Sequence, residues 1–484
     1  MTDHKDPFER ELPSILRDLA GDASESLRAR VAAVPVEVDA RINRSRTWWQ
    51  FGGSIAAAAV VAVVAVVVLS NRPVGPSPSA SPSSDGSSVA TASPSSLPSP
   101  APSSPISGVP AVQVPPADLH RLVLPGNAAL EAAWGPHLYA VALGDVAGTD
   151  RLLVADMTDG SMTRVNLPLS DMEQVTNGFG YWDDVPPMAT DGHWLAIVVW
   201  HRLGPQGIGG APCSSDAGQP LAWRILTAPI DGSTGLPSGP FVVAQAGESK
   251  RSFTLFGQGE GCSGPRLPRI SVADGRLAYD VEDTTSDRPF GSRIAVHWLD
   301  GTKPDQVLST SSQVIYLAIS GASVAWTEVA TDPGTGGQPS WSVRVSTDPA
   351  SAATSVALGA DPTSFRLPAE VRLDGDTVAW TRVTNDGPDD VWVTSLAAGS
   401  PQIVSPTTVS CTAGGLAGGT LGLQCVSVDG SNQNYVLAWS AARDLHVLVG
   451  VPPPHRPPLV SNGWLVYDAG SGGIYGMALS ALGN

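Results

Sequence analysis

The segment Asp374–Val383 reads DGDTVAWTRV and Ser320–Val329 reads SGASVAWTEV, and this recurring pattern decides the fold. In each copy a turn residue and a glycine precede a short apolar strand. Tight hairpins often need a positive φ angle, which glycine adopts readily. Related segments, which bring the number of copies to seven, lie around Gly135, Gly192, Gly275, Gly418 and Gly463.

Each glycine corner is followed by a second strand, such as RIAVHWL from Arg293 or WSVRVST from Trp341, and most copies continue into a third. A further strand precedes the glycine, as in Gln313–Ile319, so that one copy supplies four strands. Strands that are apolar throughout are buried on both faces, as they are in the blades of a β-propeller. The sequence therefore predicts an all-β domain with seven blades. Six or eight blades, a β-sandwich and an open solenoid remain alternatives.

The two ends of this region complement each other. The last copy ends soon after Gly473–Leu479 and lacks an outer strand, whereas Leu119–Pro125 (LHRLVLP) precedes the first copy without a blade of its own. Pairing of the two would close the ring and remove exposed strand edges. In this respect region 116–484 resembles TolB-like and WD40-like propellers. That resemblance implies the fold and is nearly silent on activity, because the WD and GH pairs of true WD40 repeats do not recur from copy to copy.

An apolar run precedes the propeller region. Gly52–Leu69 reads GGSIAAAAVVAVVAVVVL, which has about the length needed to cross a bilayer as a helix. Arg41, Arg44 and Arg46 precede it and only Arg72 follows closely, so the positive-inside bias places the amino terminus in the cytoplasm. We expect a single-pass transmembrane helix over 47–71 in the cell membrane, a Pro/Ser-rich disordered linker over 72–116 and an extracytoplasmic propeller over 117–484. A cleaved signal peptide and a buried core helix are the alternatives.

Residues 1–46 form the expected cytoplasmic tail. Leu12, Ile15, Leu16 and Leu19 fall on one face of a short amphipathic helix, and a second helix is expected to end at Pro35. Two such helices are too small to be stable alone, so they pack weakly on each other, lie on the membrane or fold on a cytoplasmic protein partner. The layout is similar to that of membrane-bound anti-sigma regulators of bacteria, without the metal-binding His and Cys residues of the zinc-containing type.

The outer part of the chain is acidic. The formal charge is -17, and nine Lys/Arg with nine Asp/Glu lie up to Gly75, which leaves 19 against 36 beyond it. Repulsion from phosphates argues against binding of nucleic acid. All four cysteines also lie in this part, where an oxidising environment would let them pair. We expect one disulfide between Cys411 and Cys425, which bracket a hairpin, and another between Cys213 and Cys262.

Long loops on one face of the propeller are the expected binding surface. In a four-stranded blade the loop between the second and third strands lies on the same face as the link to the next blade, and insertions 201–222, 246–267, 283–292 and 330–340 fall there. Loops held by a rigid scaffold commonly carry ligand sites. The candidate residues on this face are Trp182, Asp183, Asp184, His201, Arg202, Glu260, Asp283, Asp287, Asp386, Asp389 and Asp390.

No catalytic pattern stands out. The G-x-S-x-G motif of many hydrolases is absent, and the histidines lie in unlike contexts. Carboxylate pairs such as Asp389/Asp390 suit glycoside chemistry or calcium, yet adjacent acids in loops are more often solvated turn residues. We therefore expect a non-enzymatic binding or scaffold module that takes a protein or glycan ligand and needs no cofactor or metal. A transmembrane regulator that signals through the tail and an extracytoplasmic carbohydrate-active enzyme are the alternatives.

Overall fold

The computed structural model describes residues 103–482 apart from 127, 143, 145–147, 176–186, 204–220, 250–266, 283–291, 310–311, 331–339, 348–355, 362–367, 385–386 and 398–399. All of them belong to one compact unit, residues 98–177 and 184–484. The predicted tail, membrane-spanning segment and most of the linker lie outside the described residues. The helical segments within the described residues are the 3-10 turns η2 (Pro116–Asp118), η5 (Gly470–Gly472) and η6 (Leu479–Leu482). Within these residues no helix is long and apolar enough to cross a membrane.

Seven sheets make up the unit, which confirms the prediction of seven blades. Blade 1 holds β3 (Ala128–Trp134), β4 (His137–Ala142), β5 (Arg151–Asp156) and β6 (Met162–Asn166). Blade 2 holds β7 (Met188–Thr190), β8 (Trp194–Arg202), β9 (Leu221–Pro229) and β10 (Val242–Ser249). Blade 3 holds β11 (Ile270–Ala273), β12 (Arg276–Glu282), β13 (Ser292–Trp298) and β14 (Gln306–Ser309). Blade 4 holds β15 (Gln313–Ser320), β16 (Ser323–Ala330), β17 (Ser340–Ser346) and β18 (Val356–Asp361).

Of the remaining three blades, blades 6 and 7 each include a strand from the beginning of the described region. Blade 5 holds β19 (Pro368–Asp374), β20 (Thr377–Arg382), β21 (Asp390–Ser395) and β22 (Gln402–Ile403). Blade 6 holds β23 (Val409–Ala417), β24 (Thr420–Ser427), β25 (Asn434–Ser440), β26 (Asp444–Val449) and β1 (Ala111–Gln113). Blade 7 holds β27 (Leu459–Ser461), β28 (Trp464–Asp468), β29 (Ile474–Ala478) and β2 (His120–Leu122).

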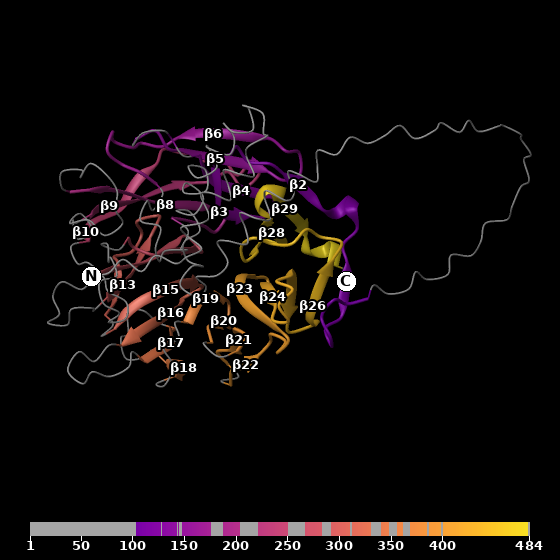
Figure 1. The fold of residues 1–484 in the computed structure, drawn as a ribbon. Coiled ribbons are helices and arrows are strands. Elements are labelled where there is room, and N and C mark those ends of the chain that lie inside the picture. Colours follow the sequence, from indigo (N-terminus) through magenta and orange to yellow (C-terminus); the bar gives the residue numbers. More distant parts are fainter. Residues whose placement is uncertain are drawn as a thin grey trace, which may run out of the picture. The chain divides into compact units, whose positions relative to one another are not determined.

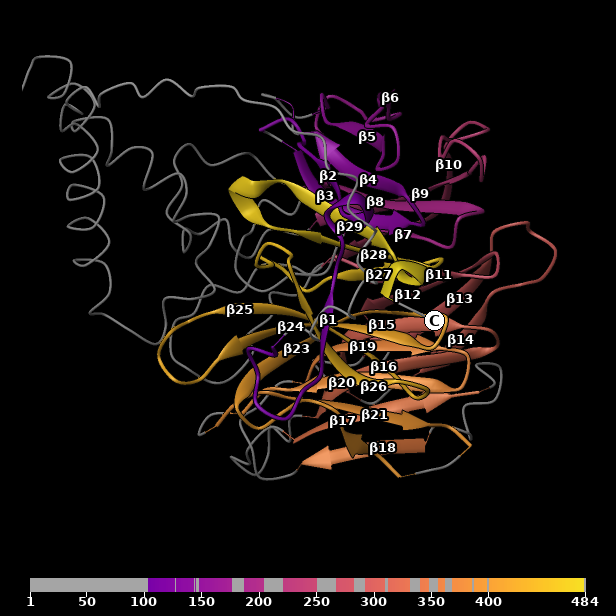
Figure 2. The same ribbon diagram turned by 90° about the vertical axis from the view of Figure 1, so that its right-hand side faces the viewer.

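The blades form a closed ring with the first strand of each at its centre. Each first strand contacts the first strand of the next blade, from β3 through β7, β11, β15, β19 and β23 to β27, and β27 contacts β3 again. The sheets accordingly stand around a common axis (Figure 1 and Figure 2). Apolar side chains fill the space between neighbouring blades, as where Val393 of β21 shares a cluster with Leu421 and Leu423 of β24. The alternatives of a sandwich and an open solenoid are thereby excluded.

The predicted closure of the ring is confirmed. The strand β2 pairs antiparallel with β29, with Leu122 opposite Ile474, so that the beginning of the domain supplies the outer strand of its last blade. The Arg121 Nε also donates a hydrogen bond to the Gly472 carbonyl at 2.9 Å. Blade 7 therefore contains three strands from one end of the domain and one from the other.

A further strand lies within the stretch that we expected to be linker. The strand β1 runs parallel to β26 and makes blade 6 five-stranded. The residues around it are anchored in the core, because Ile106, Val109 and Val114 are buried. A strand of three residues flanked by prolines gives almost no periodic pattern, which is why the sequence did not reveal it.

The glycine corners also join blades to one another. The corner glycines have positive φ angles, for example 69° at Gly275 and 54° at Gly375. In two corners the aspartate before the glycine accepts a hydrogen bond from the corner glycine of the next blade. Asp191 Oδ2 of blade 2 accepts the N–H of Gly275 in blade 3 at 2.8 Å, and Asp274 Oδ2 of blade 3 accepts the N–H of Gly321 in blade 4 at 3.0 Å. The aspartate of the D-G corner thus serves the neighbouring blade as well as its own turn.

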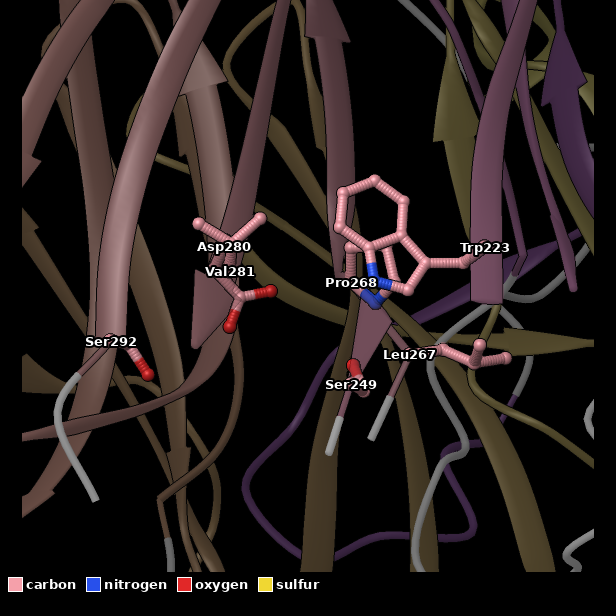
Figure 3. A pocket seen from close by; sticks show the side chains of 7 residues that line it. All are labelled: Trp223, Ser249, Leu267, Pro268, Asp280, Val281 and Ser292. Carbon is pink, nitrogen blue, oxygen red and sulfur yellow. The ribbon is translucent and has the colours of Figure 1, made fainter. Parts of the chain in front are cut away.

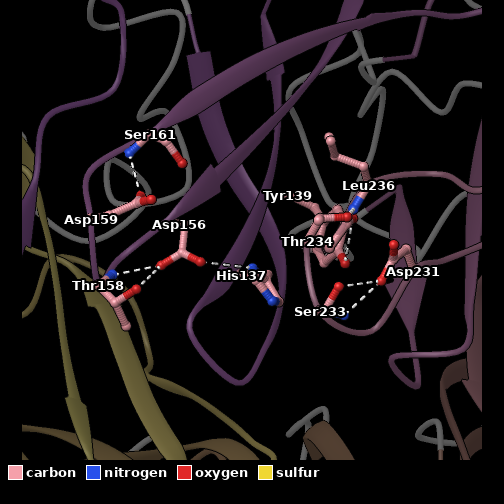
Figure 4. A network of polar contacts seen from close by, with 11 residues as sticks. His137, Tyr139, Asp156, Thr158, Asp159, Ser161, Asp231, Ser233, Thr234 and Leu236 are labelled. Atoms are coloured by element: carbon pink, nitrogen blue, oxygen red, sulfur yellow. Dashed lines mark hydrogen bonds and ion pairs between the residues drawn. The ribbon is translucent and has the colours of Figure 1, made fainter.

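Blades 1 and 2 meet on the face of these corners around the buried His137. Its Nδ1 lies 3.3 Å from a carboxylate oxygen of Asp156, and the hydroxyl of Tyr139 donates a hydrogen bond of 3.0 Å to the Gly235 carbonyl (Figure 4). A side chain at Gly235, where φ is +68°, would meet the imidazole at 2.6 Å. The close approach therefore requires glycine at this position.

The disulfide predicted within blade 6 is confirmed. Cys411 of β23 and Cys425 of β24 are directly opposite in the antiparallel ladder and are bonded, with their Cα atoms 4.1 Å apart. Both are fully buried. Cys213 and Cys262 lie outside the described residues, so the second predicted disulfide stays a prediction.

Candidate functional site

A recessed pocket lies between blades 2 and 3, on the face where the long insertions were predicted. Its wall consists of Trp223, Ser249, Leu267, Pro268, Asp280, Val281 and Ser292. These residues sit at the ends or starts of β9, β10, β12 and β13 and just before β11, next to the insertions 246–267 and 283–292. The empty space, which includes the solvent at its mouth, amounts to about 240 Å³. We call this site the blade 2–3 pocket.

The indole of Trp223 forms one side of the blade 2–3 pocket (Figure 3). Trp223 lies opposite Gly247 in the β9–β10 ladder, and a Cβ at Gly247 would meet the indole ring at 2.5 Å. The ring can pack across β10 only because residue 247 is glycine. With Leu267 and Pro268, Trp223 gives the pocket an apolar side.

The carboxylate of Asp280 lies across the pocket from this apolar side. Asp280 is 2% exposed and supplies the only acidic group among the seven lining residues. One carboxylate oxygen accepts the backbone N–H of Arg269 at 2.7 Å, which fixes its orientation. The hydroxyl-bearing Ser249 and Ser292, both 4% exposed, complete the polar part. A buried carboxylate beside an aromatic ring favours a slim cationic group.

Most predicted ligand-face residues lie outside the described residues, namely Trp182, Asp183, Asp184, Glu260, Asp283, Asp287 and Asp386. The four that are described, His201, Arg202, Asp389 and Asp390, end or begin strands on the predicted face, but in two separate blades. His201 and Arg202 close β8 of blade 2, where His201 pairs with Ala222, next to Trp223. None of the four lines the blade 2–3 pocket.

The two aspartates of blade 5 have structural partners. Asp389 accepts hydrogen bonds from the backbone N–H of Thr384 at 2.8 Å and from the hydroxyl of Ser410 at 3.0 Å. Asp390 accepts a hydrogen bond from Arg382 at 2.5 Å, and the Arg382 guanidinium lies over the Trp392 ring. These contacts tie β21 to β20 and to blade 6. They account for the carboxylate pair without a ligand.

The inner strands carry acidic residues that the sequence analysis did not select. Register shifts occur at Glu131 in β3 and at Glu370 in β19. Glu370 has a φ of +53° and accepts a hydrogen bond of 2.5 Å from Arg372, which also binds the Gly414 carbonyl. Burial raises the pKa of Glu131 from 4.5 to about 7, and the positive charge of Arg456 opposes this shift. Glu131 is therefore partly protonated at neutral pH.

Solved structures of similar fold are mainly peptidases. They include a prolyl endopeptidase (13% identity, TM-score 0.42, 70% of this chain and 46% of that chain) and a puromycin hydrolase (15%, 0.43, 71% and 50%). Another is the propeller domain of the trilobed protease of Pyrococcus furiosus (7%, 0.41, 71% and 90%). This chain spans about half the length of the first two proteins. No family model matches the chain, and no curated protein matches its sequence.

These comparisons correct the functional expectation. The prediction of a non-enzymatic binding or scaffold module is corrected here, because the solved structures of similar fold are mainly peptidases rather than scaffold proteins. The expectation that the chain is not an enzyme is likewise not confirmed. None of the structures named supports the finer resemblance to TolB-like propellers. At these identities and TM-scores the likeness shows the fold and transfers no activity.

The residues that form the blade 2–3 pocket were missed by sequence reasoning, although the described strand ends that border the insertions 246–267 and 283–292 do line it. One sign was available. Asp280 is a charged residue inside the otherwise apolar stretch LAYDV (Leu277–Val281), and a carboxylate in a buried strand requires a polar partner or a function. Trp223 offered no such sign, because tryptophans also occur in other strands as packing residues.

Proposed function

We propose that this chain is the propeller of a peptidase-related protein and that its blade 2–3 pocket holds a lysine side chain or amino-terminal ammonium group of a polypeptide. The observation that carries the proposal is the recessed Asp280 carboxylate facing the Trp223 indole. A buried carboxylate attracts a cation strongly because few water molecules screen it, and an aromatic face adds a further attraction.

The size and the charge of the site favour the same ligand. Five of the seven lining residues are buried and the other two are partly buried, so the pocket admits one slim end group rather than a folded surface. Beyond Gly75 the chain has 36 acidic and 19 basic residues, and this net negative charge attracts cationic peptides from farther away than the pocket itself can. The peptidases of similar fold make polypeptide the first ligand class to test, but the choice of a cationic group depends on the pocket.

A pair of matched peptides tests this proposal. Binding of a fluorescent octapeptide with one terminal lysine is compared with that of the same peptide carrying norleucine, using the full-length chain and fluorescence anisotropy. The lysine peptide should bind at least tenfold more tightly, and Asp280→Asn should remove that preference while its amide oxygen still accepts the Arg269 N–H. The control is Asp376→Asn, which changes an exposed carboxylate in blade 5. Equal binding of the two peptides, or an unchanged preference in Asp280→Asn, would overturn the proposal.

A further inference from the structure

Three tryptophans lie on consecutive blades, on the face that carries the glycine corners. Strand β28 of blade 7 begins with Trp464, β3 of blade 1 ends with Trp134, and β8 of blade 2 begins with Trp194. All three residues are partly exposed. We call them the tryptophan row. The blade 2–3 pocket lies at the opposite ends of the strands, so the two sites are on different faces of the propeller.

Each indole of the tryptophan row packs against the corner glycine of the following blade. A Cβ atom at Gly135, Gly192 or Gly275 would lie 3.9, 2.0 or 3.8 Å, respectively, from the indole of the preceding blade. The three indoles therefore advance by one blade at a time. Packed sheets lie about 10 Å apart, which sets the approximate spacing between neighbouring indoles.

Packing at a corner does not itself require a tryptophan. The corners of blades 4 and 6 are flanked by small side chains, namely Ser320, Ser323, Ala417 and Thr420. They form hairpins of the same kind, because each flanking pair is opposite in its antiparallel ladder. Three consecutive blades thus carry large aromatic side chains at their corners beyond what the turn needs. Partly exposed tryptophan is typical of surfaces that bind other molecules.

Two exposed aspartates adjoin the end of the row at Trp194. Asp274 directly precedes the corner glycine on which the Trp194 indole packs. The residue before Asp231 donates its N–H to the carbonyl of His193, the neighbour of Trp194, at 2.8 Å. Arg276 lies 3.6 Å from Asp274 and offsets part of the charge of that carboxylate. The Asp231 carboxylate is exposed as well, so a net negative charge remains beside Trp194.

We propose that the tryptophan row binds a proline-rich polypeptide in the polyproline II conformation, with an arginine of that polypeptide next to Trp194. This helix has three residues per turn and rises about 3.1 Å per residue, so every third residue returns to the same side after about 9 Å. That repeat is close to the spacing of about 10 Å between packed sheets. Proline-rich segments dock on aromatic surfaces at a low cost in conformational entropy.

The charge beside Trp194 favours the arginine. A guanidinium group stacks on an indole face and forms hydrogen bonds with carboxylates in the same plane. Asp231 and Asp274 are both exposed and near this indole, so they can accept those bonds. The proposal thus adds a second binding site on the face opposite to the blade 2–3 pocket and does not depend on the function proposed for that pocket.

Two fluorescent decapeptides of identical composition test the spacing. Each begins with arginine, contains three prolines among serines and alanines, and is capped at both ends so that it carries no ammonium terminus. In one the prolines are three residues apart, and in the other they are four apart. In fluorescence anisotropy with the full-length chain, the three-residue spacing should bind at least tenfold more tightly. Equal binding of the two peptides would overturn the proposal without any variant that has to fold.

Variants of the chain then locate the site. Trp194→Leu and Trp464→Leu should each weaken binding of the first peptide at least fivefold. The matched control is Trp392→Leu, which changes a partly exposed tryptophan of blade 5 and should leave binding within twofold. Norleucine in place of the arginine should weaken binding at least threefold, and the double variant Asp231→Asn/Asp274→Asn should remove that difference. Equal losses in the three tryptophan variants would refute the assignment.

The remaining outcomes separate this site from the blade 2–3 pocket and from a glycan site. Asp280→Asn should leave binding of the capped peptide within twofold, and a loss of tenfold would show that the peptide binds in the pocket instead. If Asp280→Asn removes the preference of the octapeptide for lysine while the two proline spacings bind alike, the pocket proposal holds and this one is wrong. Binding of a β-1,4-linked glucose hexamer that is lost in Trp194→Leu, with no binding of either decapeptide, would likewise overturn it.

Discussion

Replacing Leu122 by alanine tests whether the closing strand stabilises the whole ring. Leu122 lies in β2, is 5% exposed and shares an apolar cluster with Leu138 of blade 1 and with Val466 and Ile474 of blade 7. The substitution removes three carbon atoms, which at about 0.8 kcal/mol each costs about 2.4 kcal/mol of transfer free energy. The cavity left behind adds to this cost, and buried leucine-to-alanine changes typically cost about 2–5 kcal/mol.

We expect the free energy of unfolding to fall by about 3 kcal/mol, a large part of the roughly 5–15 kcal/mol of an ordinary domain. The assay is urea unfolding of the full-length chain, followed by tryptophan fluorescence and by circular dichroism. The adjacent Val123, which is 60% exposed, provides a matched control, because Val123→Ala should change the free energy by no more than about 0.5 kcal/mol. If both variants unfold at the same urea concentration, Leu122 does not anchor the ring and the reasoning is refuted.

Two further predictions concern the carboxyl groups of Asp191, which is buried, and of Glu131, which is partly buried. Asp191 accepts hydrogen bonds from the backbone N–H groups of His193, Trp194 and Gly275. Asp191→Ala should therefore lower the free energy of unfolding by roughly 2–4 kcal/mol. The control Asp274→Ala removes a more exposed acceptor and should lower it by no more than about 1 kcal/mol. Equal losses in urea unfolding would contradict the role given to Asp191. Because the pKa of Glu131 is raised to about 7, the folded chain binds more protons than the unfolded chain between about pH 4.5 and 7. The stability that the protonated Glu131 carboxyl group contributes is therefore complete below pH 4.5 and is lost as the pH rises through 7. Glu131→Gln should therefore match the parent chain near pH 4 and be more stable by roughly 1–3 kcal/mol at pH 8, and identical urea midpoints across that range would show that Glu131 is not buried as described.

Local sequence patterns determined much of the fold. The glycine corners predicted seven hairpins, because only a few residue types adopt a positive φ angle at low cost. The apolar strands after these corners predicted sheets that are buried on both faces. The unmatched segment around Leu122 was assigned to the last blade by counting strands. Cys411 and Cys425 were paired because a short hairpin places its two strands side by side.

Only the tertiary structure decided where the candidate site lies. The blade 2–3 pocket joins Trp223, Ser249, Asp280 and Ser292, which come from four strands of two blades, and no local pattern records which side chains face each other across neighbouring sheets. The sequence instead favoured Asp389 and Asp390, whose hydrogen bonds within blade 5 and to blade 6 are equally invisible in one dimension. Backbone conformation is set by neighbours along the chain, so it can be predicted from them. The environment of a carboxylate is set by packing between distant segments, and therefore requires the folded ring.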